Sequence, residues 1–418
     1  MNSIEDRRYP ESLKLLRRAE RVIPGGVWGH NRIPSSFAPD ALPWFAERAE
    51  GARMRDVDGN WYIDYICGYG AMINGYARAE VDDAVREQSA RGSTLSHATQ
   101  RSVELAELLV DLVDGAAWAS WGANGSDATW SALVVARAHT GRPLVAAVDG
   151  AYHGSHGWNG FPTAQPGRIT ADTDAVRFVR WNDIPGLDEL FGRDGPELAA
   201  IMVTPYHHPI PGAAELPDPA WIEALHRHCR RAGTLLVIDD VRAGFRLDLR
   251  GSHALFGFRP DLVCFSKGLG NGWPLSALVG AEALRAAAAE IFLAGTFWNS
   301  ANSMAAAIAN LTLLRETDGV ATMRRSGLQL TEGLVKAAER VGVPLAASGP
   351  PAMPSIVVEG DEDCRWMARF ATHMAASGVL IHPSHNWALS TAHDAELVEQ
   401  TLAAAETAME RTQEELPR

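Results

Sequence analysis

Three kinds of feature are scarce in this chain of 418 residues. The four cysteines (Cys67, Cys229, Cys264 and Cys364) are scattered without CxxC spacing, which argues against a disulfide framework and against a zinc site. No lysine-rich tract occurs, and 38 basic against 51 acidic residues give a net charge of −13, which disfavours nucleic acid as a partner. Internal repeats and low-complexity segments are also absent from the sequence.

Long apolar runs are missing as well. The first ten residues, MNSIEDRRYP, lack the apolar core of a signal peptide. No run approaches the roughly 20 apolar residues that a membrane-crossing helix needs, so no membrane partner is expected. These absences, together with a composition of 46% hydrophobic and 21% charged residues, predict a cytoplasmic globular enzyme. The length exceeds that of one ordinary core and predicts two domains.

The most informative part of the sequence is a pair of short apolar runs that each end in an ionisable residue. Thr234–Val241 (TLLVIDDV) delivers Asp239, and Asp261–Gly270 (DLVCFSKGLG) delivers Lys267. Apolar runs bounded by turn residues are typical of strands that are buried on both faces. A buried charge needs a partner, and a cofactor with a cationic ring nitrogen and an aldehyde would suit both residues. The pair therefore predicts pyridoxal phosphate.

Apolar runs and helical patterns alternate through the middle of the chain. This βαβ order predicts an α/β fold with a mostly parallel sheet and ligands at the carboxyl ends of the strands. Beyond Gly295 helices dominate, which predicts a smaller α+β domain with the N-terminal helix and a hairpin packed nearby. The expected strands are 144–148, 199–204, 234–238, 262–265, 275–279, 355–358 and 379–382, with a hairpin at 54–65. The expected helices are 11–23, 79–91, 100–113, 219–231, 303–315, 322–341, 366–376 and 395–410.

Two further segments fall just beyond expected strands. Asn124–Ala128 (NGSDA) opens a helix, and the unpaired N–H groups of a helix N-terminus form a seat for phosphate, although an ordinary helix cap would look the same. Tyr152, in Tyr-His-Gly, follows the strand at 144–148 and could cover a bound ring or form a packed turn. The placement of Asn124, Tyr152, Asp239 and Lys267 at one sheet edge is the stronger signal.

With these residues in view, the chain resembles the class III pyridoxal-phosphate-dependent aminotransferases of fold type I. The branch that contains glutamate-1-semialdehyde 2,1-aminomutase is the most similar. The resemblance runs from about Pro24 to Glu410, and its specific parts are Ile238–Arg246 (IDDVRAGFR) and Ser266–Leu275 (SKGLGNGWPL). It implies a large cofactor-binding domain at 56–300 and a small domain at 301–418. Residues 1–55 would pack with the small domain.

The resemblance implies a role for each cofactor-binding residue. Lys267 would hold pyridoxal phosphate as a Schiff base and move a proton as base and acid, and Asp239 would keep the pyridine nitrogen protonated. Val241 and Tyr152 would cover the two ring faces. Gly125 and Ser126 would bind the phosphate. Thr296 would reach the phosphate of a neighbouring subunit, which implies a homodimer with shared active sites.

Substrate residues are implied less specifically. Arg32, in Pro24–Arg32 (PGGVWGHNR), matches the arginine that holds a substrate carboxylate in the aminomutase branch. Trp28 and Trp298 lie beside the matched motifs, as does Trp158, and suggest a pocket for an apolar side chain. The expected partners are therefore a small-molecule amino donor and an oxo acceptor.

The sequence also departs from the family pattern. Asp127 and Asp240 replace glutamate, and Thr204-Pro205 replaces Glu-Pro. The following segment Tyr206–Gly212 (YHHPIPG) and the loop Phe297–Asn302 are unusual. We therefore expect an aminotransferase with a ping-pong mechanism between an amino acid and an oxo acid or aldehyde. The alternatives are an aminomutase, a pyridoxal-phosphate racemase or epimerase, and a non-catalytic protein that binds the cofactor.

Overall fold

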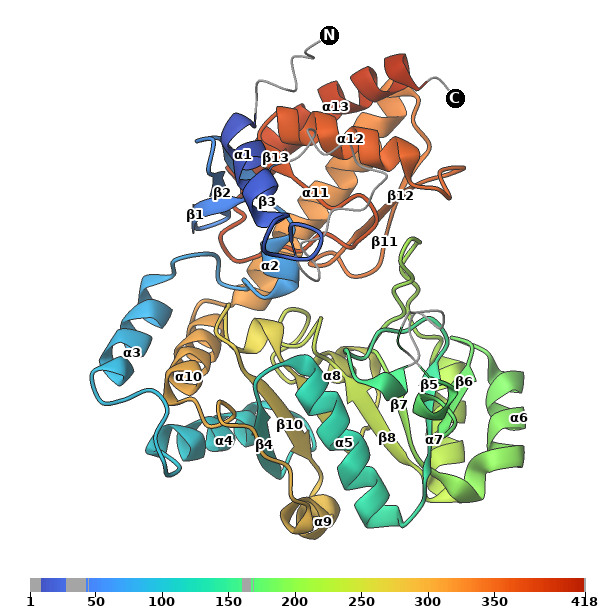
Figure 1. Ribbon diagram of the computed structural model, residues 1–418. Helices are drawn as coiled ribbons and strands as arrows, with labels where there is room; N and C mark the ends of the chain where they lie inside the picture. Colours follow the sequence, from blue (N-terminus) through green and yellow to red (C-terminus); the bar gives the residue numbers. More distant parts are fainter. Residues whose placement is uncertain (1–8, 28–42, 44, 160–166, 168, 417–418) are drawn as a thin grey trace.

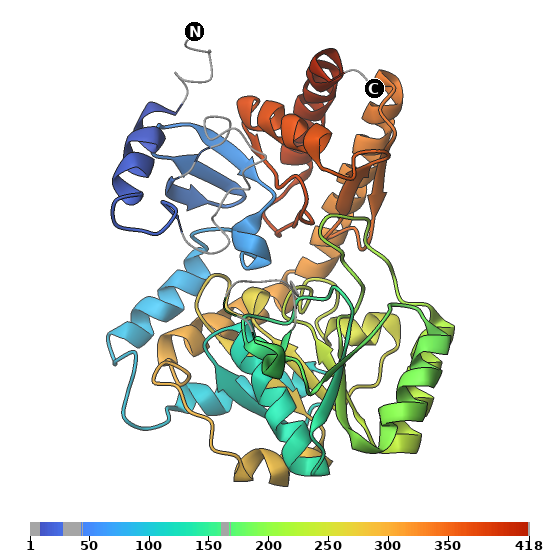
Figure 2. The ribbon, with the colours of Figure 1, turned by 45° about the vertical axis from the view of Figure 1, so that its right-hand side comes forward.

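A large seven-stranded sheet carries one half of the molecule, and a smaller four-stranded sheet with long helices carries the other (Figures 1 and 2). The computed structural model describes residues 9–27, 43, 45–159, 167 and 169–416. The large sheet has the order β4-β10-β9-β8-β7-β5-β6, and only β10 runs antiparallel to its neighbours. Its strands are β4 (Trp118–Gly122), β5 (Leu144–Val148), β6 (Val176–Val179), β7 (Leu198–Val203), β8 (Leu235–Asp239), β9 (Leu262–Phe265) and β10 (Ser276–Gly280).

Both faces of this sheet are covered by helices, which explains why its strands are apolar throughout. Helix α5 (Gly125–Thr140) packs on one face, where it contacts alternate strand residues such as Ala200 and Val237. On the other face Ile201 and Leu236 pack with α4 (Gln100–Leu112), α6 (Ile184–Asp194) and α7 (Pro219–Ala232). Strands covered on both sides read as continuous apolar runs rather than alternating ones.

The smaller sheet joins the two ends of the described chain. Its order is β1 (Ala46–Glu50), β2 (Arg53–Asp56), β3 (Trp61–Asp64) and β13 (Val379–Leu380), with β13 parallel to β3. Around it lie α1 (Pro10–Ala19), α2 (Cys67–Gly70), α11 (Gly319–Val341), α12 (Arg365–Ala376) and α13 (Ala395–Glu415), with the hairpin β11 (Leu345–Ser348) and β12 (Ser355–Val358). The remaining helices are α3 (Ala79–Ser89), α8 (Ser252–Phe256), α9 (Arg285–Glu290) and α10 (Ala301–Glu316).

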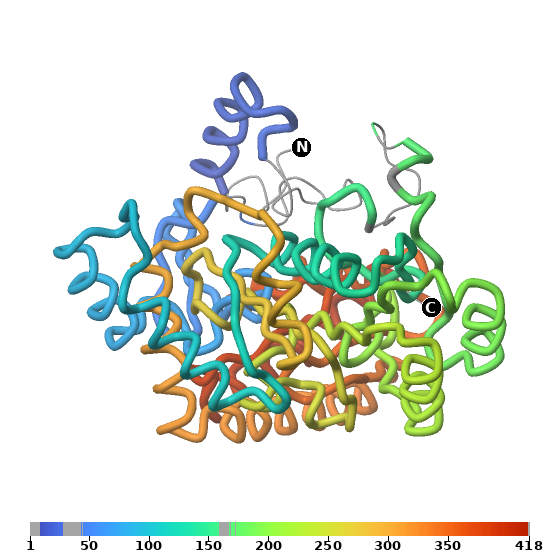
Figure 3. Tube along the Cα trace, turned by 90° about the horizontal axis from the view of Figure 1, so that it is seen from below, coloured from blue at the N-terminus to red at the C-terminus, as the bar shows by residue number. Residues whose placement is uncertain are grey.

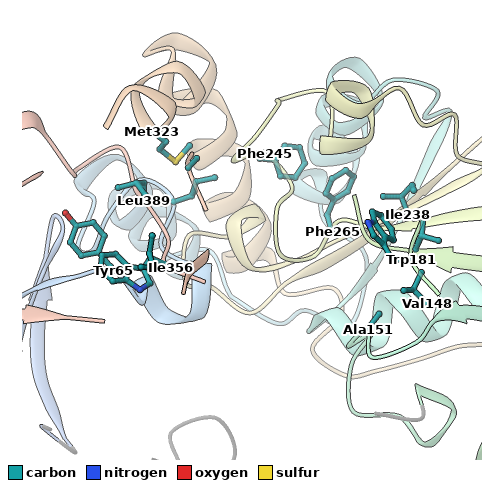
Figure 4. Packing of buried hydrophobic residues seen from close by; sticks show 14 of the residues in the cluster. Tyr65, Val148, Ala151, Trp181, Ile238, Phe245, Phe265, Met323, Ile356 and Leu389 are labelled. Atoms are coloured by element: carbon teal, nitrogen blue, oxygen red, sulfur yellow. The ribbon is translucent and has the colours of Figure 1, made fainter. Parts of the chain in front are cut away.

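One continuous core connects the two halves. Figure 4 follows it from Val148 and Trp181 beside the large sheet, past Phe265 and Phe245, to Met323 and beyond. Helix α10 packs against α3 and α4, although it lies beyond the predicted boundary at residue 300. Helix α1 (blue) projects from the rim of the molecule in Figure 3. The boundaries 1–55, 56–300 and 301–418 stay a prediction.

Most elements lie where the sequence predicts them. The predicted strands 144–148 and 262–265 match β5 and β9, and the hairpin turns at Asp58–Asn60 between β2 and β3. Fold type I, with a mostly parallel sheet, is confirmed. The sequence reading missed β1, β4, β6, β11, α2, α6, α8 and α9. Of these, β4 (WASWG) has only five residues and β6 (VRFV) only four, and each includes polar or small residues. Neither therefore forms a recognisable apolar run.

Candidate active site

The carboxyl ends of β4, β5, β7, β8 and β9 meet at one edge of the large sheet, which faces the smaller half. A cavity of about 320 Å³ opens there. Its lining residues are Asn124, Gly125, Ser126, Thr129, Tyr152, His153, Gly154, Ser155, Thr204, Asp239, Val241, Arg242, Ser266 and Lys267. Open α/β sheets bind ligands at this edge. The four residues that the sequence places at strand ends therefore lie together.

Asp239 is a buried carboxylate with two hydrogen-bond partners. It ends β8, and its Oδ1 accepts a hydrogen bond of 3.1 Å from the N–H of Val241. Its Oδ2 lies 2.7 Å from Nδ1 of His153. The imidazole of His153 is itself buried and stacks on Trp158, with ring centroids 6.0 Å apart. These contacts fix the direction of the carboxylate, which offsets part of the cost of burying it.

Lys267 follows β9 in a left-handed backbone conformation with φ +42°, which is uncommon for a residue with a side chain. Burial lowers the pKa of its amine to about 7, and the nearby guanidinium of Arg242 acts in the same direction. Asp239 opposes both effects. A lysine amine that is partly neutral near pH 7 can act as a nucleophile or a base. Strained backbone at such a residue is a frequent feature of functional sites.

The N-terminus of α5 forms one wall of the cavity. Asn124 caps the helix and accepts a hydrogen bond from the N–H of Asp127, whose carboxylate accepts in return from the N–H of Asn124. Gly125 is required by close packing, because a Cβ there would lie 2.7 Å from Cγ1 of Val241. The hydroxyl of Ser126 accepts a hydrogen bond of 2.9 Å from the N–H of Ser155. This helix start presents backbone N–H groups and a hydroxyl beside the cavity, as a phosphate site does.

The predicted cofactor fits the groups around the cavity. The donor set supplies an acid, an amine of lowered pKa and a helix N-terminus, which match the ring nitrogen, the aldehyde and the phosphate of pyridoxal phosphate. Tyr152 and Val241 line the same cavity from different strand ends. Gly125 leaves room at the point where the helix N-terminus meets Val241.

Other predicted residues lie elsewhere. Thr296 is exposed and does not line this cavity, and the indole of Trp298 packs instead against Gly295. Trp28 and Arg32 lie outside the described residues. A reach from Thr296 into a neighbouring subunit is not tested by one chain, so its role stays a prediction.

Two ionisable residues in the cavity wall stand inside the recognised motifs but are not among the predicted cofactor-binding residues. His153 is the second residue of Tyr-His-Gly and contacts Asp239 directly. Arg242 follows Val241 in the central signature and lines the cavity. Arg246, in contrast, is buried and donates hydrogen bonds to the carbonyls of Gly70 and Leu389, so its role is structural. Position within a recognised motif was the available signal for His153 and Arg242.

Within the described part of the chain, no group of three His, Cys, Asp or Glu side chains could hold a metal ion. No helix among the same residues is long and apolar enough to cross a membrane.

Comparisons with known proteins agree with this geometry. The family model "Aminotransferase class-III" matches residues 36–410. An aminopentol aminotransferase of Sphingopyxis macrogoltabida is 41% identical over 94% of this chain and 92% of its own length. A glutamate-1-semialdehyde 2,1-aminomutase of Chloroflexus aggregans is 32% identical over 97% of this chain and 99% of its own. The FumI protein of Sphingopyxis sp. MTA144, solved in its pyridoxal-phosphate internal aldimine form, superposes with a TM-score of 0.94 at 39% identity, and the match covers 97% of each chain.

Proposed function

Because this chain belongs to the class-III aminotransferase family, and is a pyridoxal-phosphate-dependent aminotransferase that takes an amino donor and an oxo acceptor, we propose the following roles for its residues. The reaction proceeds by a ping-pong mechanism in which donor and acceptor use the cavity at the strand ends in turn. The observation that carries this proposal is the placement of Lys267, Asp239 and the N-terminus of α5 around one cavity.

When bound, pyridoxal phosphate supplies an aldehyde that condenses with amines and a protonated ring that accepts electrons. The amine of Lys267 is the group that holds the cofactor between reactions and, once released, moves a proton to and from the substrate carbon. Its pKa of about 7 leaves much of it neutral and able to accept that proton at neutral pH. Asp239 holds a proton on the ring nitrogen, and His153 directs its carboxylate through the 2.7 Å contact between Nδ1 and Oδ2.

The remaining cofactor contacts follow from the walls of the cavity. Gly125 and Ser126 bind the phosphate through the N–H groups of the first turn of α5 and the Ser126 hydroxyl. Tyr152 and Val241 cover the two faces of the ring. We also propose the division into a segment 1–55, a cofactor-binding domain 56–300 and a small domain 301–418.

A homodimer with shared active sites is supported by an apolar surface. Phe292 is 92% exposed and Phe297 is 67% exposed, on either side of Thr296. Leu95 and Val103 are also exposed. They follow Ser93 in the sequence, and the carbonyl of Ser93 accepts a hydrogen bond of 2.8 Å from the N–H of Ala301. Exposed apolar side chains are frequent at protein interfaces when they lie together. In such a dimer Thr296 would bind the phosphate of the neighbouring subunit's cofactor. The proposed location is the cytoplasm.

The substrate contacts are proposed from the sequence match. Arg32 would hold the carboxylate of an oxo acid or amino acid, with Trp28 and Trp298 beside the substrate. Since one relative at 41% identity is named for an aminopentol, the amino donor is proposed to be an amine that carries several hydroxyl groups. The second candidate function is an intramolecular amino transfer, because one relative is named as an aminomutase. A racemase and a non-catalytic cofactor-binding protein come after it.

A spectral screen of amino donors tests this function. Purified protein is expected to be yellow, and a true donor should convert the cofactor to its amine form without any oxo acceptor present. An added oxo acid should then restore the original spectrum, as the ping-pong mechanism requires. Lys267→Ala should lose the covalent cofactor that borohydride fixes in the wild type. An unchanged colour and rate in Lys267→Ala, or conversion only by a molecule that also carries the acceptor, would contradict the proposal.

A further inference from the structure

Three buried asparagines lie behind the turn that carries Lys267. Asn310 comes from α10, Asn74 from the loop between α2 and α3, and Asn271 from the loop that follows Lys267. Asparagine is mostly exposed in proteins, because its amide loses hydrogen bonds to water when it is buried. None of the three lines the cavity of the active site. Their presence at one turn indicates that they hold its backbone.

Asn310 contacts the backbone of this turn directly. Its Nδ2 donates hydrogen bonds of 2.8 and 3.0 Å to the carbonyls of Gly268 and Leu269, the two residues that follow Lys267. The amide oxygen only accepts hydrogen bonds, so the two carbonyls fix which way the amide of Asn310 points. Gly268 is packed closely as well, because a Cβ there would lie 3.2 Å from the carbonyl oxygen of Gly244. The turn is therefore held both by α10 and by close packing.

The amide of Asn310 is in turn oriented by a chain of hydrogen bonds. Its Oδ1 accepts a bond of 2.8 Å from Nδ2 of Asn74, whose Oδ1 accepts one of 3.1 Å from the hydroxyl of Thr391. Asn271 accepts a bond of 2.8 Å from the N–H of Asn74 and donates one of 3.0 Å to the carbonyl of Gly75. Hydrogen bonds in series strengthen one another. Because Thr391 lies between β13 and α13, this chain begins in the smaller half.

The backbone of Lys267 requires such support. It is in the left-handed region, at φ +42°, and a residue with a side chain keeps this conformation only where its surroundings fix it. The conformation sets the direction of the Cα–Cβ bond, and the amine lies at the end of a flexible stem of four carbons. A small rotation of the turn would therefore move the amine relative to Asp239 and the rest of the cavity.

We propose that Asn310, oriented by Asn74 and Thr391, is a positioning residue that fixes the direction of the Lys267 side chain. These three residues do not line the cavity, so they act through the turn and not on the substrate. The inference rests on the role proposed for Lys267. It also connects that lysine to the smaller half, through the hydroxyl of Thr391.

Modification by cyanate of the full chain without cofactor tests this role, because cyanate reacts with a neutral amine. The sequence has two other lysines, Lys14 and Lys336, and both are exposed. Mass spectrometry of peptides separates the three, and the exposed pair serves as an internal reference. In the wild type the rate at Lys267 should have its midpoint at about pH 7. In Asn310→Leu the midpoint should rise by about one pH unit or more, since an amine that is less buried returns towards its ordinary pKa.

Thr401→Val is the matched control. Thr401, on α13, is fully buried like Asn310, and its hydroxyl also donates to a backbone carbonyl, that of Leu397, at 2.8 Å. Denaturant unfolding should show a loss of stability in both variants, but Thr401→Val should keep the wild-type midpoint. In the holoenzyme, Asn310→Leu should lower kcat at least about tenfold with little change in KM, because a displaced amine slows proton transfer and leaves substrate binding unchanged.

Asn74→Leu is the second variant, for the case in which Asn310→Leu does not fold. It keeps the two donors of Asn310 but removes the amide that orients them, so the midpoint should rise by a smaller amount. A wild-type midpoint in Asn310→Leu, or in Asn74→Leu if only that variant folds, would overturn the inference. An equal rise in Thr401→Val would do the same, because it would trace the shift to lost stability alone.

The reaction with cyanate needs neither cofactor nor turnover, so this result is separate from the donor screen. If a donor converts the cofactor but the midpoint at Lys267 does not move in the asparagine variant, only the positioning role fails. If the midpoint moves but no donor converts the cofactor, the proposed function fails, and the control of the Lys267 side chain by Asn310 stands.

Discussion

Nδ1 of His153 lies 2.7 Å from Oδ2 of Asp239, and both side chains are almost fully buried. The acid at the end of β8 is therefore directed by a residue from the loop after β5, two strands away in the sheet. Trp158 stacks on the far side of the imidazole and restricts its rotation. A buried charge with a fixed partner keeps one orientation, as an acid that serves a ring nitrogen must.

Asp239→Asn is expected to bind the cofactor but to lower kcat at least about a hundredfold, or about 2.7 kcal/mol of barrier. The amide no longer favours a protonated ring nitrogen, while the size of the side chain is unchanged. Steady-state rates and the absorption of the bound cofactor measure the two effects. Wild-type turnover in this variant would remove Asp239 from the site.

Asp240→Asn is the matched control for that substitution. Asp240 is the next residue but is buried elsewhere, where it accepts a hydrogen bond of 2.7 Å from the N–H of Ser252. Burial raises its pKa to about 8, so the carboxyl is mostly neutral at pH 7 and an amide is a close substitute. We expect kcat to change less than about threefold, within the usual effect of a neutral hydrogen-bond replacement.

His153→Phe should keep the aromatic stack on Trp158 and remove the hydrogen bond to Asp239. A hydrogen bond to a charged group contributes about 1.5–3 kcal/mol, so we expect kcat to fall about ten- to a hundredfold. KM should change much less, because His153 acts through Asp239 rather than on the substrate. His153→Gln, which retains an N–H donor, should recover part of the rate. A wild-type rate in His153→Phe with a loss in His153→Gln would assign His153 to packing alone.

The sequence predicts the strands well where a buried strand forms a short, continuous apolar run. The strands β5 and β9 are short apolar runs that end at turn residues, and their predicted bounds match the structure. The hairpin at Asp58–Asn60 was equally clear. Strand β4 was missed because its place in the sheet comes from pairing with β10, a contact between residues about 160 positions apart that no local pattern records.

Asp239 and Lys267 could be placed at the cavity from the sequence, because each is an ionisable residue at the end of an apolar strand. His153 was not assigned, because its contact with Asp239 joins the loop after β5 to the end of β8, 86 residues away in the sequence. Arg242 and Arg246 both belong to the central signature. The structure distinguishes them: Arg246 is buried and donates hydrogen bonds to backbone carbonyls, whereas Arg242 lines the cavity. Side-chain direction at the end of a signature is set by tertiary packing, so the sequence alone gives no means to choose between them.

Removal of the amine should change how stability depends on pH. In the folded protein Lys267 takes up its proton only below about pH 7, against an ordinary value of 10.5. Between these values the unfolded chain binds more protons, so the free energy of unfolding should rise with pH by up to about 1.4 kcal/mol per unit. Denaturant unfolding of cofactor-free wild type and Lys267→Met should therefore give a difference that grows in the wild type's favour from pH 7 to 10. A difference that stays constant over this range would contradict the lowered pKa.

Kinetics with oxo-acid and aldehyde acceptors can show whether Arg32 or Arg242 binds the substrate carboxylate. Arg32→Ala is expected to raise KM for oxo acids at least about tenfold, since a lost charged hydrogen bond costs about 1.5–3 kcal/mol. Aldehyde acceptors, which carry no carboxylate, should change less than about twofold. Arg242→Gln is the comparison, because Arg242 lines the cavity. A selective effect on oxo acids in Arg242→Gln alone would transfer the role of anchor to Arg242.

The proposed dimer with shared active sites can be tested by mixing two inactive variants. Lys267→Ala and Thr296→Arg should each be inactive, because the first lacks the amine and the second places a bulky side chain at the partner's phosphate site. If Thr296 completes the site of the neighbouring subunit, a mixed dimer has one site with an intact Lys267 and an intact Thr296. Unfolding and refolding an equal mixture should then restore about a quarter of wild-type activity, since half the dimers are mixed and each has one working site. If Thr296 instead served its own subunit, every site in the mixture would carry one defect and no activity would return.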